Sequence, residues 1–191
     1  MIERKIDMKT IYLIRHGETL FNVMGLEQGQ CDSPLTAKGI EQALQAKKWF
    51  NDHHISFDKV YTSTSERAID TCELITNQPY TKLKGLKEIY LGTKEASLRS
   101  SSPAYGYTDY FVQFGGEHID EVTNRIYQTI DKIVHEQGDT ILIVSHGLVI
   151  RRFLHNINYP KTDTVKYDNC VIFKILYDNE YHVIEDIHPA Q

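Results

Sequence analysis

Apolar residues in this chain form short strand-like runs that are separated by stretches with the spacing of amphipathic helices. A run of four apolar residues at 11–14 ends at Arg15 and His16. Such a run is typical of a parallel strand covered on both faces. Residues 140–144 form a second apolar run, which is followed closely by His146. The pattern predicts two buried strands that each deliver a histidine at the carboxyl end.

Helical spacing occupies the intervals between the strand-like runs. One helix is predicted to begin at Thr36, whose side chain can cap it. Its apolar face is predicted to comprise Ile40, Ala43, Leu44, Ala46 and Phe50. Ser63 and Glu66 have the spacing of a capping box, which predicts a second helix with Arg67 in its first turn. A third, long amphipathic helix is expected to end at Gly138.

Four weaker runs complete the predicted sheet. Residues 57–62 and 81–84 are expected to form strands between the helices, as parallel α/β sheets require. Residues 169–176 and 181–187 form a final pair that is expected to close one edge of the sheet in antiparallel orientation. The alternation predicts one α/β domain over residues 1–191 with a mainly parallel sheet. Ligands bind such sheets beyond the carboxyl ends of the strands.

The segment 93–116 lacks clear periodicity. It contains a polar stretch at 100–103 and several aromatic residues: Tyr105, Tyr107, Tyr110, Phe111 and Phe114. A substrate lid and an excursion packed on the body of the protein are both compatible with this composition.

Composition and charge exclude several classes of partner. The 191 residues are 41% hydrophobic and 25% charged, and the formal net charge is −5. This balance argues against nucleic acid or an anionic membrane as a partner, so an anion site has to be a local basic cluster. No apolar run is long enough to cross a bilayer, and residues 1–10 lack the apolar core of a signal peptide. We therefore expect a cytoplasmic protein, and the sequence leaves its oligomeric state open.

The cysteines favour free thiols over a disulfide framework or a zinc site. Cys31, Cys72 and Cys170 are widely spaced and form no CxxC pair. Cys31 lies near the proposed site, where either an inert thiol or a redox-sensitive one is compatible with the sequence. No metal-ligand cluster or cofactor motif is present, so we expect neither a metal nor a cofactor.

An arginine beside a histidine at a strand end suits an anionic ligand. A guanidinium clamps oxygen atoms in a planar fork, and a neutral imidazole nitrogen can attack as a nucleophile. An isolated pair of this kind is usually a surface feature. Two histidines at strand ends, with Arg15 and Arg67 at equivalent positions, are difficult to explain by packing alone.

Taken together, the motifs resemble those of the histidine phosphatase superfamily, which is also called the phosphoglycerate mutase-like family. The matching positions are 15–19, Asn22, 28–29, 32–36, Gly39, 61–63, 67–68, Thr71, Glu88, 115–117 and 145–147. They occur in the order of the family from residue 11 to about residue 155, and the set is far more specific than any one motif. The resemblance implies a three-layer α/β/α sandwich.

The resemblance also implies roles for individual residues. His16 matches the nucleophile that becomes phosphohistidine, and Arg15, Arg67 and His146 match residues that bind the phosphoryl oxygens. Glu88 matches the acid that protonates the leaving oxygen. The two cations should hold the pKa of His16 down and neutralise charge without a metal.

Glu88 is assigned on a loose segment pattern. Three other carboxylates are candidates for the same role, namely Glu18, Glu95 and Glu117. The substrate-binding positions that the resemblance implies, besides those of the arginines and His146, are Asn22, Gln28, Gly29 and Gly147.

A phosphatase is the principal functional expectation, with a small phosphorylated molecule as its substrate. The resemblance implies that a mutase of this family would have a longer chain with a basic insertion. Here residues 93–117 carry two cations, Lys94 and Arg99, against three acids. A cofactor-dependent phosphoglycerate mutase and a non-catalytic phosphate-binding module are the alternatives. Sugar phosphates, nucleoside phosphates and phosphoproteins all remain open as substrates.

Overall fold

The computed structural model describes residues 8–101 and 109–189. Within these residues, six strands form one sheet in the order β3-β2-β4-β1-β5-β6. The strands are β1 (Lys9–Arg15), β2 (Lys59–Ser63), β3 (Thr81–Leu83), β4 (Thr140–Ser145), β5 (Ile172–Tyr177) and β6 (Tyr181–Ile187). The α-helices are α1 (Leu20–Met24), α2 (Ala37–Asp52), α3 (Glu66–Ile75), α4 (Ile119–Val134) and α5 (Gly147–Asn156). Short 3₁₀ helices are η1 (Lys84–Leu86), η2 (Gly92–Lys94), η3 (Arg99–Ser101) and η4 (Asp109–Phe114).

Four strands of the sheet are parallel, and two close one edge in antiparallel orientation. β1 and β4 are parallel neighbours in the centre, while β5 pairs antiparallel with both β1 and β6. The predicted mainly parallel sheet with an antiparallel edge is therefore confirmed. The register sets Arg15 opposite Ser145, so the chain leaves the sheet at His16 and at His146 side by side.

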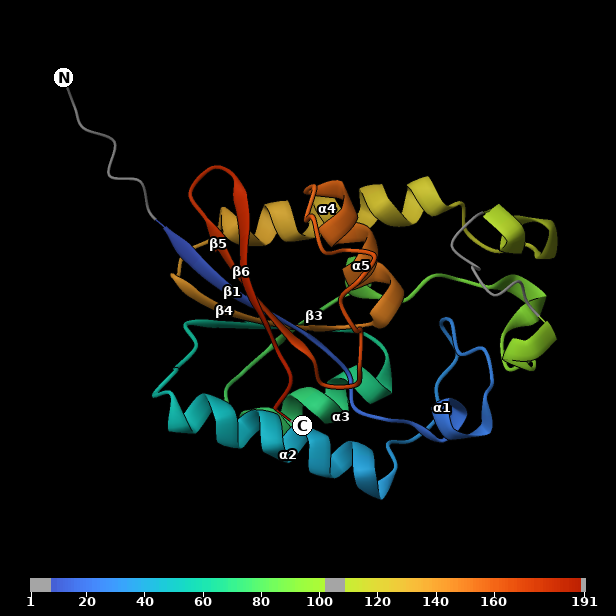
Figure 1. The fold of residues 1–191 in the computed structure, drawn as a ribbon, viewed down its shortest axis with the longest axis horizontal. Helices are drawn as coiled ribbons and strands as arrows, with labels where there is room; N and C mark the ends of the chain where they lie inside the picture. The colour runs from blue at the N-terminus through green and yellow to red at the C-terminus, as the bar shows by residue number, and fades with distance from the viewer. Residues whose placement is uncertain (1–7, 102–108, 190–191) are drawn as a thin grey trace.

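Helices cover both faces of the sheet, which confirms the three-layer sandwich (Figure 1). Helices α4 and α5 lie on one face, where Ile11 and Leu13 of β1 join a core with the apolar stripe of α4. Helices α2 and α3 lie on the other face, over Tyr12 and Ile14. Alternate residues of one strand thus enter two separate cores, as a strand buried on both sides requires.

Helix α2 begins as predicted, but its buried face is different. Thr36 is the N-cap, and its hydroxyl accepts a hydrogen bond from the Gly39 amide at 3.0 Å. Ile40 and Leu44 were expected in the core, yet they are 41% and 46% exposed. The buried stripe consists of Gly39, Ala43, Ala46 and Phe50. This stripe has helical spacing, and Ile40 and Leu44 lie one residue further round the helix.

The predicted capping box at the start of α3 is wrong. The N-cap is Ser65, and its side chain makes no capping bond. Asp32, which is distant in the sequence, accepts hydrogen bonds from the amides of Glu66 at 2.8 Å and Arg67 at 3.4 Å. A carboxylate from another loop therefore satisfies the amino end of this helix.

Other boundaries also differ from the predictions, and β2 begins at Lys59 instead of residue 57. Helix α1 was not predicted, and it is closed by a capping box between Thr19 and Asn22. Helix α4 ends at Val134, four residues before Gly138. Strand β5 begins at Ile172 instead of residue 169, because Cys170 has a φ of +59° that interrupts extended backbone.

The segment 93–116 is packed on the body in part. Phe111 is 4% exposed and belongs to the core under α4 and α5, and Tyr110 packs against that core. These contacts agree with a packed excursion at this end of the segment. Residues 102, 103, Tyr105 and Tyr107 lie outside the described residues, and lid movement stays a prediction. Among the helices of residues 8–101 and 109–189, none has the length and apolar character to span a bilayer.

Gly39 offers a test of how tightly α2 is seated. A Cβ atom at this position would lie 2.0 Å from the backbone oxygen of Glu18, in the loop that follows His16. A glycine-to-alanine change inside a helix normally stabilises it. Here we expect Gly39→Ala to destabilise the protein by about 1–3 kcal/mol, as overpacking does. Urea unfolding measures the change, with Glu41→Ala on the exposed face as the control; stabilisation by Gly39→Ala would contradict the packing described.

Candidate functional site

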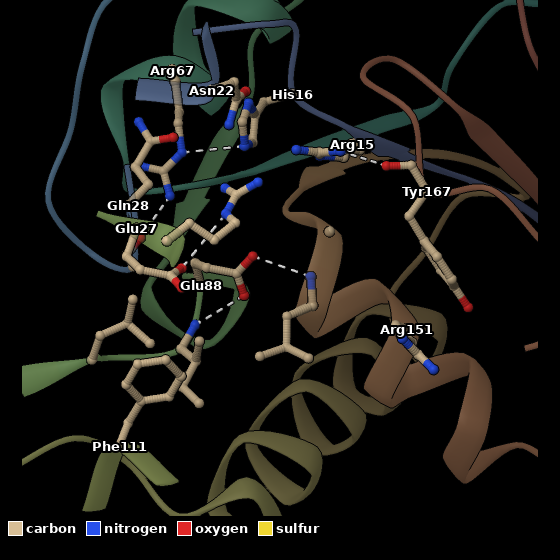
Figure 2. Close-up of a pocket in the computed structure, with 16 residues that line it drawn as sticks. Arg15, His16, Asn22, Glu27, Gln28, Arg67, Glu88, Phe111, Arg151 and Tyr167 are labelled. Carbon is tan, nitrogen blue, oxygen red and sulfur yellow. Dashed lines mark hydrogen bonds and ion pairs between the residues drawn. The ribbon is translucent and has the colours of Figure 1, made fainter. Parts of the chain in front are cut away.

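The ends of the central strands open into a cavity of about 370 Å³ (Figure 2). The predicted site residues that line it are Arg15, His16, Asn22, Gln28, Gly29, Arg67, Glu88 and Gly147. They come from segments that are far apart in the sequence and meet at one end of the sheet. His146 is fully buried beneath the cavity, with its ring centroid 5.2 Å from that of His16.

The hydrogen bonds of His16 define which ring nitrogen can react. Nδ1 lies 2.8 Å from the carbonyl oxygen of Gly17. A carbonyl oxygen only accepts, so Nδ1 carries the proton and Nε2 keeps a lone pair. Nε2 accepts a hydrogen bond from Nε of Arg67 at 3.3 Å (Figure 2). Asn169, which the sequence analysis missed, binds the backbone oxygen of His16 at 3.0 Å and steadies the strand end.

Arg67 is 1% exposed, and its guanidinium is held from several sides. Nη1 donates to Asp32 at 2.6 Å and to the carbonyl oxygen of Cys31 at 2.9 Å. Nη2 donates to the carbonyl oxygen of Gly29 at 2.7 Å. With the bond to His16, these contacts use four of its five N–H groups. Asp32 therefore both neutralises Arg67 and caps the helix that carries it.

Arg15 reaches the cavity from the end of β1. Its guanidinium donates a hydrogen bond to the backbone oxygen of Tyr167, which also lines the cavity (Figure 2). A Cβ atom at Gly147 would lie 3.3 Å from Nε of Arg15. The absence of a side chain at Gly147 thus lets the arginine cross the start of α5. Two cations consequently face the histidine end of the cavity.

Glu88 points into the cavity from the segment after η1 (Figure 2). One carboxylate oxygen accepts from the Ile89 amide at 3.0 Å, and the other accepts from the Leu148 amide at 3.1 Å. Leu148 lies in the first turn of α5, so the positive end of this helix faces the carboxylate. The other three candidate acids do not line the cavity. Instead, Glu18 binds Thr36 and Lys38. Glu95 binds Gln30, and Glu117 binds Arg125.

His146 is oriented by Ser63 at the end of β2. The Ser63 hydroxyl lies 2.8 Å from Nε2 of His146 and accepts a hydrogen bond from the Ser65 amide at 3.3 Å. Nδ1 of His146 is buried and has no hydrogen-bond partner among the described residues. His146 therefore lies beside His16 without lining the cavity, and its contact with a phosphoryl oxygen stays a prediction.

Burial is the main reason why both histidines are neutral. It lowers the pKa of His16 well below the ordinary value, and the charges of Arg67 and Arg15 lower this pKa further. The pKa of His146 is lowered by burial first and then by Arg67, His16, Arg15 and Arg125. The cations that the sequence suggested thus have a smaller effect on these pKa values than desolvation has.

The three remaining predicted binding residues contact the cavity in different ways. The side-chain oxygen of Asn22 accepts hydrogen bonds from the backbone amide of Thr19 and the side chain of Asn169. The side-chain nitrogen of Asn22 is therefore the group that can donate to a ligand. Gln28 bonds Thr19 at 3.0 Å and Ser33 at 3.1 Å, so it supports the cavity wall. Gly29 acts through its carbonyl oxygen on Arg67.

Sequence reasoning missed four polar residues that line the cavity: Glu27, Arg99, Arg151 and Tyr167. Glu27 lies 3.9 Å from Arg99, and Arg151 pairs with Asp163 at 2.7 Å. Arg151 follows Gly147 by one helical turn, and this spacing was the signal that could have identified it. The fold itself was needed to find the other three.

Cys31 has the properties of an inert thiol. Its Sγ donates a hydrogen bond to the backbone oxygen of Gln28 at 2.8 Å, and burial raises its pKa. A raised pKa reduces the thiolate fraction and hence the reactivity. In the described part of the chain, no three His, Cys, Asp or Glu side chains are grouped so that they could hold a metal ion. Chemistry without a metal stays a prediction.

Comparison with known proteins decides the family. The sequence profile of the histidine phosphatase superfamily (branch 1) matches residues 11–188. The chain belongs to this superfamily.

Curated relatives of this histidine phosphatase include both phosphatases and mutases. It is 28% identical over 188 residues to a broad-specificity phosphatase of Saccharomyces cerevisiae, covering 92% of this chain and 78% of that protein. It is 32% identical over 157 residues to a probable phosphoglycerate mutase of Salmonella choleraesuis, covering 75% and 72% respectively. The structure of a phosphoglycerate mutase from Bacillus anthracis superimposes with a TM-score of 0.86 at 28% identity, covering 97% and 96% of the two chains.

The two neutral histidines predict how stability depends on pH. The unfolded chain binds protons on these residues below about pH 6.5, whereas the folded protein does not. We therefore expect the free energy of unfolding to fall as the pH drops from 7 to 5.5, with a slope of up to about 2.7 kcal/mol per pH unit for two histidines. Urea unfolding at several pH values measures the slope.

His16→Asn should remove about half of this slope, because only one of the two histidines that take up a proton on unfolding then remains. His53→Asn, which makes the same change at an exposed histidine outside the site, serves as the control. A stability that does not vary between pH 7 and 5.5 would show that His16 and His146 are not held neutral.

Proposed function

We propose that this histidine phosphatase hydrolyses phosphomonoesters through a phosphohistidine intermediate on His16. The observation that carries the proposal is the geometry of this residue in the cavity. Gly17 holds the proton on Nδ1, so the lone pair of Nε2 lies on the side of Arg67. A neutral, oriented imidazole beside two guanidiniums suits in-line attack on a phosphoryl group.

In the first step, Nε2 of His16 attacks phosphorus and the bond to the ester oxygen breaks. Arg15 and Arg67 neutralise the charge on the phosphoryl oxygens, with Asn22 and His146 as further donors. Glu88, in its protonated form, gives its proton to the leaving oxygen, and the alcohol departs. This transfer is needed because an alkoxide is a poor leaving group.

In the second step, water attacks the phosphorus atom and the bond between phosphorus and Nε2 breaks. Glu88 is now a carboxylate and accepts a proton from the attacking water. The products are inorganic phosphate and free His16. Because the proton of Glu88 is restored, the enzyme is ready for another turnover without a metal or a cofactor.

Local charge favours hydrolysis over mutase chemistry. A mutase has to hold a second anionic group, which calls for an excess of positive charge away from the nucleophile. Here the other two arginines that line the cavity each have a carboxylate nearby, because Arg99 lies 3.9 Å from Glu27 and Arg151 lies 2.7 Å from Asp163. The broad-specificity phosphatase among the relatives supports the same choice. We place this activity in the cytoplasm, acting on a small phosphorylated molecule.

The covalent step is tested by trapping the intermediate. Brief mixing with p-nitrophenyl phosphate followed by an alkaline quench should leave an acid-labile phosphoprotein, since a phosphorus–nitrogen bond survives alkali. His16→Ala should abolish both the adduct and turnover. His53→Ala, at an exposed histidine, is the control and should retain both. Turnover at the wild-type rate in His16→Ala would contradict the mechanism.

The choice between phosphatase and mutase is tested with phosphoglycerates. We expect phosphate release from simple monoesters without a bisphosphate primer, because water is the acceptor of the phosphoryl group. Interconversion of 2- and 3-phosphoglycerate should be slower than phosphate release, as measured by phosphorus NMR of the two isomers. Efficient, primer-dependent interconversion would reverse the assignment.

A further inference from the structure

Arg125 of α4 holds the segment that carries Glu88, and we propose that it is a positioning residue for the acid step. The proposal rests on the function proposed above. Arg125 does not line the cavity, so it is not a catalytic residue. Its effect on the reaction would pass through the backbone of residues 85–90.

All five N–H groups of Arg125 are used, three on the carbonyl groups of this segment and two on Glu117. Nη1 donates to the carbonyl oxygens of Gly85 at 3.0 Å and Lys87 at 2.7 Å, and Nη2 donates to that of Glu88 at 3.4 Å. Nε and Nη2 bind the two carboxylate oxygens of Glu117 at 3.1 and 2.9 Å. A planar fork of five donors matches this set, whereas the three donors of a lysine do not.

Glu117 fixes the backbone on the C-terminal side of Glu88. Its carboxylate accepts from the Tyr90 amide at 2.7 Å, and its own amide donates to the Tyr90 oxygen at 2.9 Å. The backbone is therefore fixed at residues 85, 87 and 88 by the arginine and at residue 90 by its partner. Glu88 lies among these anchors, and its side chain points into the cavity (Figure 2).

The segment needs such an anchor because it has little regular structure of its own. After η1 ends at Leu86, residues 87–91 belong to no helix or strand. Their carbonyl groups find few partners from secondary structure, so donors have to come from side chains. Gly85 also seats the segment on α4, since a Cβ there would lie 1.9 Å from Oγ1 of Thr129.

Positioning matters at Glu88 because proton transfer depends steeply on geometry. A displacement of about 1 Å at a reacting group can reduce a rate on the order of a hundredfold. Arg125 and Glu117 are about one-fifth exposed, so their bonds are shielded from water in part. An ordinary structural ion pair would have no reason to bind the carbonyl groups of residues 85, 87 and 88, at and just before the proposed acid.

The leaving group distinguishes positioning from a merely structural role. Nitrophenolate is a weak base that hardly needs a proton, whereas the alkoxide of glycerol does. In single-turnover experiments, we expect Arg125→Met to slow phosphoenzyme formation from glycerol 2-phosphate on the order of tenfold or more, but from p-nitrophenyl phosphate less than about threefold. Arg125→Lys should show the same preference to a smaller extent.

Two comparisons sharpen this experiment. Glu88→Gln should show the same preference for the nitrophenyl ester, and adding Arg125→Met to it should cause no further loss on glycerol 2-phosphate, because both changes remove one function. Arg152→Met is the matched control. Arg152 ties α5 to α4 through Thr123 at 2.8 Å, and among the described residues it makes no hydrogen bond or ion pair with residues 85–90, so both substrates should be affected equally.

Each outcome has a separate meaning. Equal losses on both substrates in Arg125→Met, with Glu88→Gln still selective, would overturn the positioning role and leave the proposed function intact. If Glu88→Gln slowed the reaction of both substrates equally, Glu88 would not be the acid and Arg125 would not be its positioning residue. Absence of a phosphoenzyme in the wild type would contradict the proposed function itself. If circular dichroism shows that Arg125→Met does not fold, Arg125→Lys is judged by the same criterion.

Discussion

The buried guanidinium of Arg67 sets the conditions that the surrounding structure has to meet. A charge removed from water costs several kcal/mol unless partners compensate for it. Asp32 provides the opposite charge, and the carbonyl oxygens of Gly29 and Cys31 provide further acceptors. The remaining bond goes to His16. The arrangement that makes the arginine tolerable in the interior therefore also places its charge beside His16, where it adds to the effect of burial and lowers the pKa of the imidazole further.

The loop that supplies these carbonyl groups depends on a distant part of the chain. Glu95 accepts from the Gln30 amide at 2.7 Å, and backbone bonds join Glu27 to Ala96 and Ser97. Gly29 itself has a φ of +54°, which suits glycine and turns its carbonyl group towards Arg67. The segment between η2 and η3 thus completes the environment of the arginine, and Arg99 at the start of η3 lines the cavity.

The sequence predicted the fold well where the information was local and periodic. The buried runs before Arg15 and His146 identified the two central strands, and their shared pattern brought both histidines to one end of the sheet. The cap of α3 could not be predicted in this way, because Asp32 arrives from more than thirty residues upstream. Similarly, Ile40 and Leu44 are apolar but lie beside the stripe that the sheet and α3 cover, and only the packed structure shows which stripe that is.

The site was predictable to a similar extent and for similar reasons. Short motifs identified eight residues that the cavity brings together. They did not distinguish Gln28, whose amide is bound within the wall, from residues suited to a ligand. Neither Arg125 nor Glu27 could be found, because their relevance comes from contacts across elements. Short motifs identify residues that line the cavity. The residues that hold those side chains in place form no short motif, so the sequence alone does not reveal them.

The hydrogen bond between Arg67 and His16 gives the proposed mechanism a further property. It occupies the lone pair of Nε2, so the nucleophile is not available while the bond persists. A phosphoryl group brings oxygen acceptors to which Nε of Arg67 can donate in place of His16, and it neutralises part of the charge of Arg67 and Arg15 at the same time. A neutral ligand offers neither strong acceptors nor compensating charge, and Arg67 then keeps its bond to His16. In the proposed mechanism, the anion that is to be attacked is therefore also what frees the imidazole to attack it.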